Sequence, residues 1–166
     1  MRVAFYNQMF ALNGRSLRKS LAGHWRVHRR KDPQKMYEVA RLKNTCDIID
    51  SSNPDIVGLC EVLEGQEKIL ADLLARRGYN CFFGQGHQTK GNRLHLGVML
   101  ASKFELERVD SQTFPVKNKM GGGGGFVHCK ATDMDLDVLG VHLSNGKNPK
   151  KRGDLCSADG IFKRLC

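Results

Sequence analysis

An apolar run that ends in a carboxylate constrains the fold of this chain more than any other feature. Residues 54–65 read PDIVGLCEVLEG, so that Pro54 and Asp55 introduce an apolar stretch that stops at Glu61. A continuous apolar run of this length is typical of a strand buried on both faces, because a half-buried strand alternates polar and apolar residues. Such a strand needs a covering layer on each side, which favours a layered α/β fold.

The segments around this run predict a strand–helix–strand–helix order. Residues 2–6 predict a first strand, which ends at Asn7. A helix is expected from Pro33 to the SSNP stretch before Asp55, and a second helix over 66–77 ends at Gly78. The buried face of the first helix is expected to carry residues at three-to-four-residue spacing: Met36, Val39, Ala40, Cys46 and Ile49.

The rest of the chain predicts strands alone. Strands are expected over 79–83, 94–101 and 105–114, followed by a hairpin formed by 126–132 and 136–143. Two helices can cover one face of a sheet, and the sequence shows no obvious cover for the other face. We therefore expect a layered α/β sandwich to which this chain contributes mainly one sheet and its helices. The glycine run at 121–125 is expected to be a mobile connection.

Length and composition favour one soluble domain. The 166 residues fit a single domain. No segment approaches the roughly 18–20 apolar residues that span a bilayer, and the N-terminus is a poor signal peptide. The six cysteines lack the CxxC spacing of a zinc site. We therefore expect an intracellular, cytoplasmic protein with reduced thiols and no membrane span.

Positive charge is concentrated in two segments. The net charge is +10, while residues 15–35 hold eight Lys/Arg against one Asp and residues 144–153 hold four Lys/Arg and no acid. These segments together carry +11, so the remainder is nearly neutral. A polyanionic partner such as nucleic acid explains this pattern. Solvated loops that keep the protein soluble explain it equally well.

Three polar residues occupy matching positions at the ends of apolar strands: Asn7, Glu61 and His142. If the strands are neighbours, these residues converge where ligands bind in layered α/β proteins. Glu and Asn supply the oxygen ligands that Mg²⁺ prefers, and His suits proton transfer or a hydrogen bond to a phosphoryl oxygen. Each residue also has a structural explanation, since Asn7 and Glu61 are possible caps and His142 a possible core histidine.

Taken in order, these segments resemble the endonuclease/exonuclease/phosphatase superfamily, whose fold is DNase I-like. The resemblance rests on the N-terminal strand with Asn7, the DIVGLCEV stretch with Glu61, GVMLAS, and VHLS with His142. It runs in family order from about Arg2 to Ser144. It implies a divalent-metal-dependent phosphohydrolase that acts on a phosphate ester.

The resemblance also implies roles for individual residues. Glu61 matches the metal-binding glutamate, Asn7 the asparagine that helps to hold the metal, and His142 the histidine that contacts the scissile phosphate. Arg93 is the candidate for a residue that faces the phosphate, with His95 as the alternative. The implied metal is Mg²⁺, for which Mn²⁺ often substitutes.

Two further motifs of the family, an Asp-x-Asn and a later Asp-His pair, are not found in this sequence. We therefore expect residues 1–166 to form one domain of this kind that lacks its C-terminal half and leaves one sheet face apolar and exposed. The basic segments favour a nuclease-like activity over a small-substrate phosphatase. The alternative is a non-catalytic module that binds nucleic acid or another polyanion.

Overall fold

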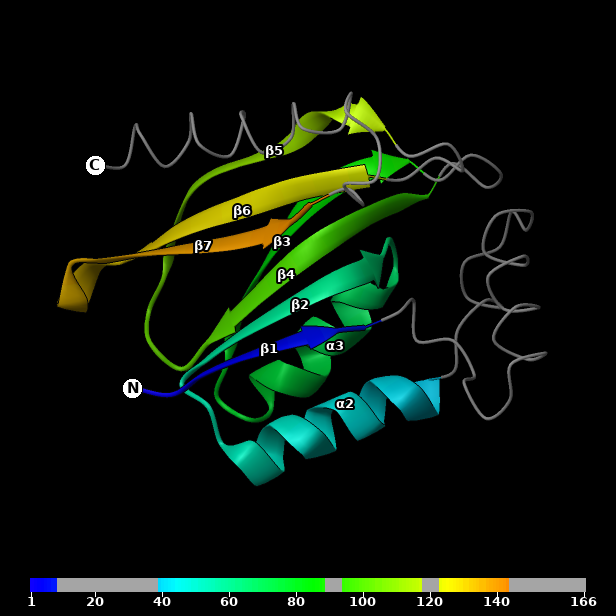
Figure 1. The fold of residues 1–166 in the computed structure, drawn as a ribbon. Coiled ribbons are helices and arrows are strands. Elements are labelled where there is room, and N and C mark those ends of the chain that lie inside the picture. Colours follow the sequence, from blue (N-terminus) through cyan, green and yellow to red (C-terminus); the bar gives the residue numbers. More distant parts are fainter. Residues whose placement is uncertain (9–38, 89–93, 118–122, 144–166) are drawn as a thin grey trace.

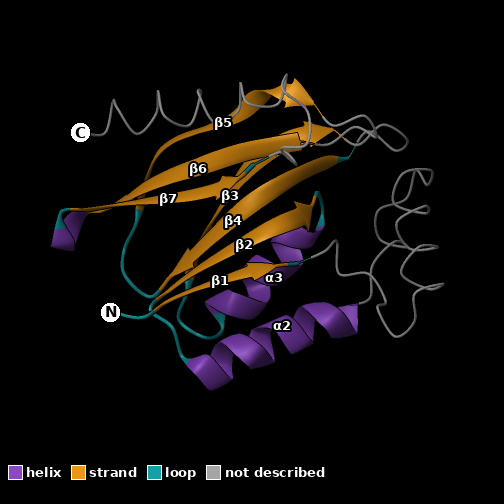
Figure 2. Ribbon diagram, viewed as in Figure 1, coloured by secondary structure: helices purple, strands orange, loops and turns teal. Residues whose placement is uncertain are grey.

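The computed structural model describes residues 1–8, 39–88, 94–117 and 123–143, which form two β-sheets and two α-helices (Figures 1 and 2). The basic segments 15–35 and 144–153 lie outside the described residues. The elements follow in this order: β1 (Val3–Asn7), α2 (Val39–Ser52), β2 (Ile56–Leu63), α3 (Gln66–Ala75), β3 (Asn80–Gln88), β4 (His95–Ser102), β5 (Glu107–Lys117), β6 (Gly123–Ala131), a short 3₁₀ helix (Thr132–Met134) and β7 (Leu136–His142).

The strands divide into a four-stranded sheet of order β1-β2-β4-β3 and a three-stranded sheet of order β5-β6-β7. β1 runs parallel to β2, and every other pair is antiparallel. The layered α/β sandwich is therefore confirmed, and so is the hairpin of β6 and β7. The structure differs in how it divides the strands, because the last three strands form a second sheet where one sheet was expected to contain most of the chain.

Helices α2 and α3 cover one face of the four-stranded sheet (Figure 1). The buried stripe of α2 consists of Leu42, Cys46 and Ile49, which pack with residues of β2 and α3. The predicted stripe was wrong at its N-terminal end, because Val39 and Ala40 are exposed. Leu42 replaces them by continuing the four-residue spacing from Cys46. Pro33 and Met36 lie outside the described residues.

The second sheet packs on the opposite face of the four-stranded sheet. Its inward side chains form a buried cluster with those of β4 and with Leu106, which directly precedes β5. The cluster consists of Val98, Leu100, Leu106, Val127, Cys129 and Ala131. The two backbones approach closely at Gly125, where an added Cβ would lie 3.1 Å from the Gln85 carbonyl oxygen. The expectation of a mobile connection at 121–125 is thus wrong for Gly123–Gly125, which belong to β6, while 121 and 122 lie outside the described residues.

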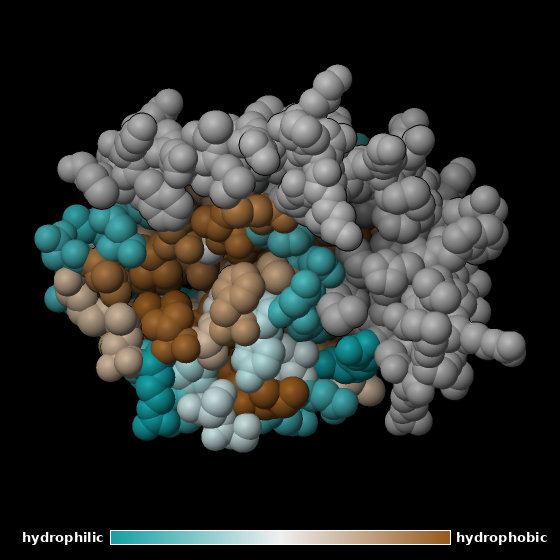
Figure 3. Space-filling view, viewed as in Figure 1, coloured by the Kyte–Doolittle hydropathy of each residue, from teal (hydrophilic) through white to brown (hydrophobic). Residues whose placement is uncertain are grey.

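The second sheet leaves β1 uncovered. Tyr6 packs against the helix-side core, so Phe5 and Val3 point to the other face, where they remain 58% and 65% exposed. The Phe5 ring lies against Gly58 of β2. Figure 3 shows hydrophobic surface between β7 and β1 on this side of the molecule. The expected exposed apolar face is therefore reduced to this strip, because β5–β7 cover the rest.

Candidate functional site

Glu61 lies at a β-bulge in β2. The pairing with β4 shifts register between Cys60 and Val62, and Glu61 adopts a φ of 56°. This left-handed conformation costs roughly 1–2 kcal/mol for a residue with a Cβ atom. The apolar stretch stops at Glu61 in the sequence, but β2 continues past it to Leu63. The bulge explains how an apolar strand carries a carboxylate, because it turns Glu61 partly out of the buried row.

His142, the last residue of β7, faces Glu61 from the second sheet. Its Nε2 lies 3.8 Å from Glu61 Oε1, and the two side chains are 19% and 23% exposed. Burial lowers the pKa of His142, and the Glu61 carboxylate only partly opposes this effect. The imidazole is therefore neutral at pH 7. Its Nδ1 is buried and has no hydrogen-bond partner among the described residues.

Asn7 ends β1 beside the bulge. It pairs in register with Cys60, the residue that precedes Glu61, and its side chain is exposed. The C-terminal ends of β1, β2 and β7 point to the same edge of the sandwich (Figure 1), which we call the site edge. The structure thus brings together Asn7, Glu61 and His142, whose roles remain predictions.

The two candidates before the GVML stretch are Arg93 and His95. Arg93 lies outside the described residues. His95 directs Nδ1 to the Gly86 carbonyl oxygen at 2.7 Å, and its Nε2 lies 3.3 Å from the Gln88 side-chain nitrogen. The ring therefore ties β4 to β3, which gives it a structural explanation.

A buried polar residue that no sequence pattern indicated lies beside the site. Gln8 directly follows Asn7, is only 4% exposed, and its Oε1 accepts a hydrogen bond from Thr45 Oγ1 of α2 at 3.0 Å. No periodic pattern points to Gln8, because it lies just beyond the end of β1. Its partner on α2 is 37 residues away along the chain.

The donor atoms at the site edge suit a hard cation. The Glu61 carboxylate and the Asn7 carboxamide oxygen fit Mg²⁺, which commonly binds one or two carboxylates and keeps several waters. The adjacent Cys60 is a poor ligand, because burial, with a smaller effect of Glu61, raises the pKa of its thiol to about 11. No group of three or more His, Cys, Asp or Glu side chains within the described ranges forms a metal cluster.

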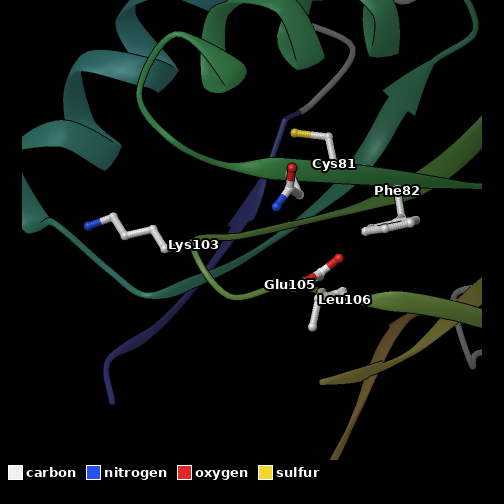
Figure 4. Close-up of a pocket in the computed structure, with 6 residues that line it drawn as sticks. Cys81, Phe82, Lys103, Glu105 and Leu106 are labelled. Atoms are coloured by element: carbon white, nitrogen blue, oxygen red, sulfur yellow. The ribbon is translucent and has the colours of Figure 1, made fainter. Parts of the chain in front are cut away.

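An open pocket of about 420 Å³ lies at the opposite edge of the sheet (Figure 4). It is lined by Asn80, Cys81, Phe82, Lys103, Glu105 and Leu106. Asn80 pairs with Ser102, which also pairs with Ile56 at the start of β2. Burial raises the pKa of the Cys81 thiol to about 12, so it is no thiolate nucleophile at neutral pH. This pocket contains none of the predicted site residues.

Several solved structures have the same fold as this chain. An endonuclease/exonuclease/phosphatase from Beutenbergia cavernae matches with a TM-score of 0.61 and 18% identity, over 93% of this chain and 41% of that one. A mannosyl-6-phosphatase from Bacteroides thetaiotaomicron matches with a TM-score of 0.59 and 16% identity, over 99% and 60%. The human Nocturnin catalytic domain with bound sulfate matches with 0.56 and 14%, over 84% and 55%.

This chain thus spans about half the length of these relatives. No curated protein matches the sequence significantly. Within the described ranges, no helix has the length and apolar character that a membrane crossing requires. A family described as "Endonuclease/Exonuclease/phosphatase family" matches residues 23–151, which is most of the sequence. The chain therefore belongs to the endonuclease/exonuclease/phosphatase family.

Proposed function

We propose that this chain forms part of a divalent-metal-dependent phosphohydrolase and supplies Asn7, Glu61 and His142 to its active site. The observation that carries the proposal is the 3.8 Å approach of His142 Nε2 to the Glu61 carboxylate across two sheets. Glu61 lies there in a bulge with a left-handed backbone. Strained backbone and incompletely satisfied polar groups gather at functional sites in proteins.

Glu61 and Asn7 would hold the metal, which we propose is Mg²⁺ or Mn²⁺. When bound, such an ion neutralises charge on the phosphoryl group and orients the attacking water. The neutral His142 can donate a hydrogen bond from Nε2 to a phosphoryl oxygen, since Nε2 rather than the buried Nδ1 faces the acidic side chain. Arg93 is the proposed phosphate contact because a guanidinium binds phosphate through two hydrogen bonds.

Within this class we propose a nuclease-like phosphodiesterase. The support is the charge of segments 15–35 and 144–153, which suits a nucleic-acid backbone. The names of the structural relatives leave a phosphomonoester substrate open, because one is a mannosyl-6-phosphatase.

A non-catalytic polyanion-binding module is the second candidate. The observation that favours it is the small donor set, since Glu61 is the one carboxylate that the described residues bring to His142. Such a module would use the basic segments alone. Its binding to nucleic acid would fall steeply with salt and would not depend on Glu61 or on metal.

Hydrolysis of plasmid DNA and of a simple phosphodiester separates the two candidates. The assay compares wild type, Glu61→Gln and the control Glu105→Gln, which changes an exposed carboxylate at the opposite edge. The enzyme proposal requires activity that depends on Mg²⁺ or Mn²⁺, is lost in Glu61→Gln and survives in Glu105→Gln. Salt-sensitive DNA binding without metal-dependent hydrolysis would instead establish the module.

A further inference from the structure

Gln8 is a buried polar residue that the proposed chemistry does not use. It lies one position beyond Asn7 and is 4% exposed. A buried amide costs free energy unless it is hydrogen-bonded, so the contacts of Gln8 indicate what it stabilises. Those contacts connect Gln8 to β2 at the residue before Glu61 and to helix α2.

The backbone of Gln8 continues the β1–β2 ladder up to the bulge. Its N–H donates to the Cys60 carbonyl oxygen at 2.8 Å, and Asn7 is already in register with Cys60. The next residue of β2 is Glu61, where the regular pairing with β4 breaks. This hydrogen bond therefore joins the residue after Asn7 to the residue before Glu61.

The side chain of Gln8 ties the same point to helix α2. Its Oε1 lies 3.0 Å from Thr45 Oγ1, and Thr45 is followed directly by Cys46, which is fully buried in the helix-side core. The Thr45 hydroxyl also lies 3.0 Å from the Arg41 carbonyl oxygen within the helix. The single hydroxyl proton of Thr45 is therefore shared between Gln8 and an acceptor within its own helix.

The two ends of β1 are held differently: Arg2 exchanges backbone and side-chain hydrogen bonds with Asp55 at the start of the strand, and Gln8 connects the other end to α2. Among the described strands β1 lies at the edge of its sheet and pairs with β2 alone, and both Val3 and Phe5 are largely exposed. Edge segments with few buried apolar contacts open more easily than the core of a sheet. Loss of the contact to α2 would remove the tie between the C-terminal end of β1 and the helix layer, at the position next to Asn7.

We infer that Gln8, held by Thr45, is the positioning residue that fixes the spacing between Asn7 and Glu61. The inference rests on the proposed function only in that these two residues form the metal-binding pair. Gln8 itself need not touch metal or substrate. The rival explanation is a buried amide that adds general stability and has no particular effect on the site edge.

The test uses the full chain and two readouts: the dissociation constant for Mn²⁺, measured by electron paramagnetic resonance, and amide hydrogen exchange. Thr45→Val removes the hydroxyl at nearly constant shape, Gln8→Leu removes the amide, and Thr45→Ser restores the hydroxyl. The matched control is Tyr79→Phe, which removes a 2.6 Å hydrogen bond to the Pro54 carbonyl oxygen at the opposite edge.

We expect Thr45→Val and Gln8→Leu to weaken Mn²⁺ binding about tenfold, in the range seen when groups that orient metal ligands are removed. Amide exchange should accelerate at residues 6–8 and 60–62 in both variants. Thr45→Ser should restore both properties, and Tyr79→Phe should leave both unchanged even if it melts at a lower temperature. Equal effects of Thr45→Val and Tyr79→Phe on Mn²⁺ binding would establish the rival explanation.

The outcomes also separate this inference from the proposed function. If wild type binds Mn²⁺, Glu61→Gln abolishes binding and Thr45→Val does not alter it, the inference is wrong and the metal site stands. If wild type binds no Mn²⁺, the proposed function fails. Hydrogen exchange then tests on its own whether Gln8 and Thr45 anchor the end of β1. Faster exchange confined to residues 6–8 and 60–62 in Thr45→Val then supports the anchor, and unchanged exchange overturns it.

Discussion

The two edges of the four-stranded sheet are built in opposite ways. At the edge near the start of β2, the Tyr79 hydroxyl donates to the Pro54 carbonyl oxygen, Lys103 binds Asn53, and Ser102 Oγ accepts from the Phe104 amide. Each edge has a residue with a left-handed backbone, but at the first edge it is Asn53, a residue type that tolerates this conformation, while at the site edge it is Glu61. At the site edge, in addition, a buried nitrogen of His142 lacks a partner among the described residues.

This difference is the one expected if the first edge serves stability and the site edge serves the proposed chemistry. Polar groups at the first edge satisfy one another, so the fold gains what hydrogen bonds provide. The site edge retains strain and incompletely satisfied polarity, which a folded protein keeps where a ligand or reaction uses them. Substitutions at the site edge should therefore mainly change activity, and substitutions at the opposite edge should mainly change the free energy of unfolding.

The largest expected effect is on activity at Glu61. Replacement by either Ala or Gly should lower metal-dependent hydrolysis at least about a hundredfold, the upper range for groups that only support metal ligands. The free energy of unfolding should be higher for Glu61→Gly than for Glu61→Ala by about 1 kcal/mol, because only alanine is strained in the left-handed conformation. Chemical denaturation measures this difference.

The order of the two variants is the informative result. At a regular strand position Gly is the less stable residue by about 0.5–1 kcal/mol. If Glu61→Ala is more stable than Glu61→Gly, the bulge is not strained, and the contrast between the edges disappears.

At the opposite edge, Tyr79→Phe should lower the free energy of unfolding by about 1–2 kcal/mol, because a buried carbonyl loses its partner. The rate of hydrolysis should not change when it is measured at a temperature where wild type and variant are both fully folded. Thermal melts and hydrolysis rates on the same preparation measure both. A loss of activity without a loss of stability would mean that this edge takes part in the reaction.

A smaller effect concerns the pH dependence of stability. Burial lowers the pKa of His142 in the folded protein below that of the unfolded chain, so the unfolded chain binds the proton first as pH falls. The folded state should lose stability from about pH 6.5 downward until the folded-state pKa of His142 is passed. Urea unfolding of metal-free wild type and His142→Gln, from pH 8 to 5, measures the slope.

The variant should show a flatter profile than wild type over this interval, while Tyr79→Phe should keep the wild-type slope. A slope that is the same in wild type and His142→Gln would contradict the burial of a neutral imidazole at the site edge.

The smallest effect is expected at the pocket of the opposite edge. Asn80→Ala changes an exposed side chain, so the free energy of unfolding should shift by no more than about 0.5 kcal/mol. Hydrolysis should stay within about twofold of wild type. A larger change in the rate of hydrolysis would give this pocket a role in the reaction and would contradict the difference proposed between the two edges.

Local patterns predicted much of the fold. The apolar stretch of β2, the leucine spacing of α3 and the β6–β7 hairpin are all readable over a few residues, and all are present. Asn7, Glu61 and His142 could be selected because each follows or ends an apolar run. Their proximity also follows from strands that end at one edge.

Long-range pairing determined what could not be predicted. The bulge at Glu61 depends on the register between β2 and β4, which no local pattern encodes. The second sheet and the strand position of Gly125 depend on the packing of β6 against β3. Gln8 became recognisable only when the fold brought it to Thr45.

The uncovered position of β1 has a consequence for how the protein folds. Val3 pairs with Ile56, which is 53 positions further along the chain, and closing so long a loop costs conformational entropy before any contact forms. β1 offers little apolar surface in return, while β3 pairs with β4, the next strand along the chain, and β2 and β4 bury nearly all of their side chains. We therefore expect β1 to dock last. On this view Asn7 reaches Glu61 at the final step of folding.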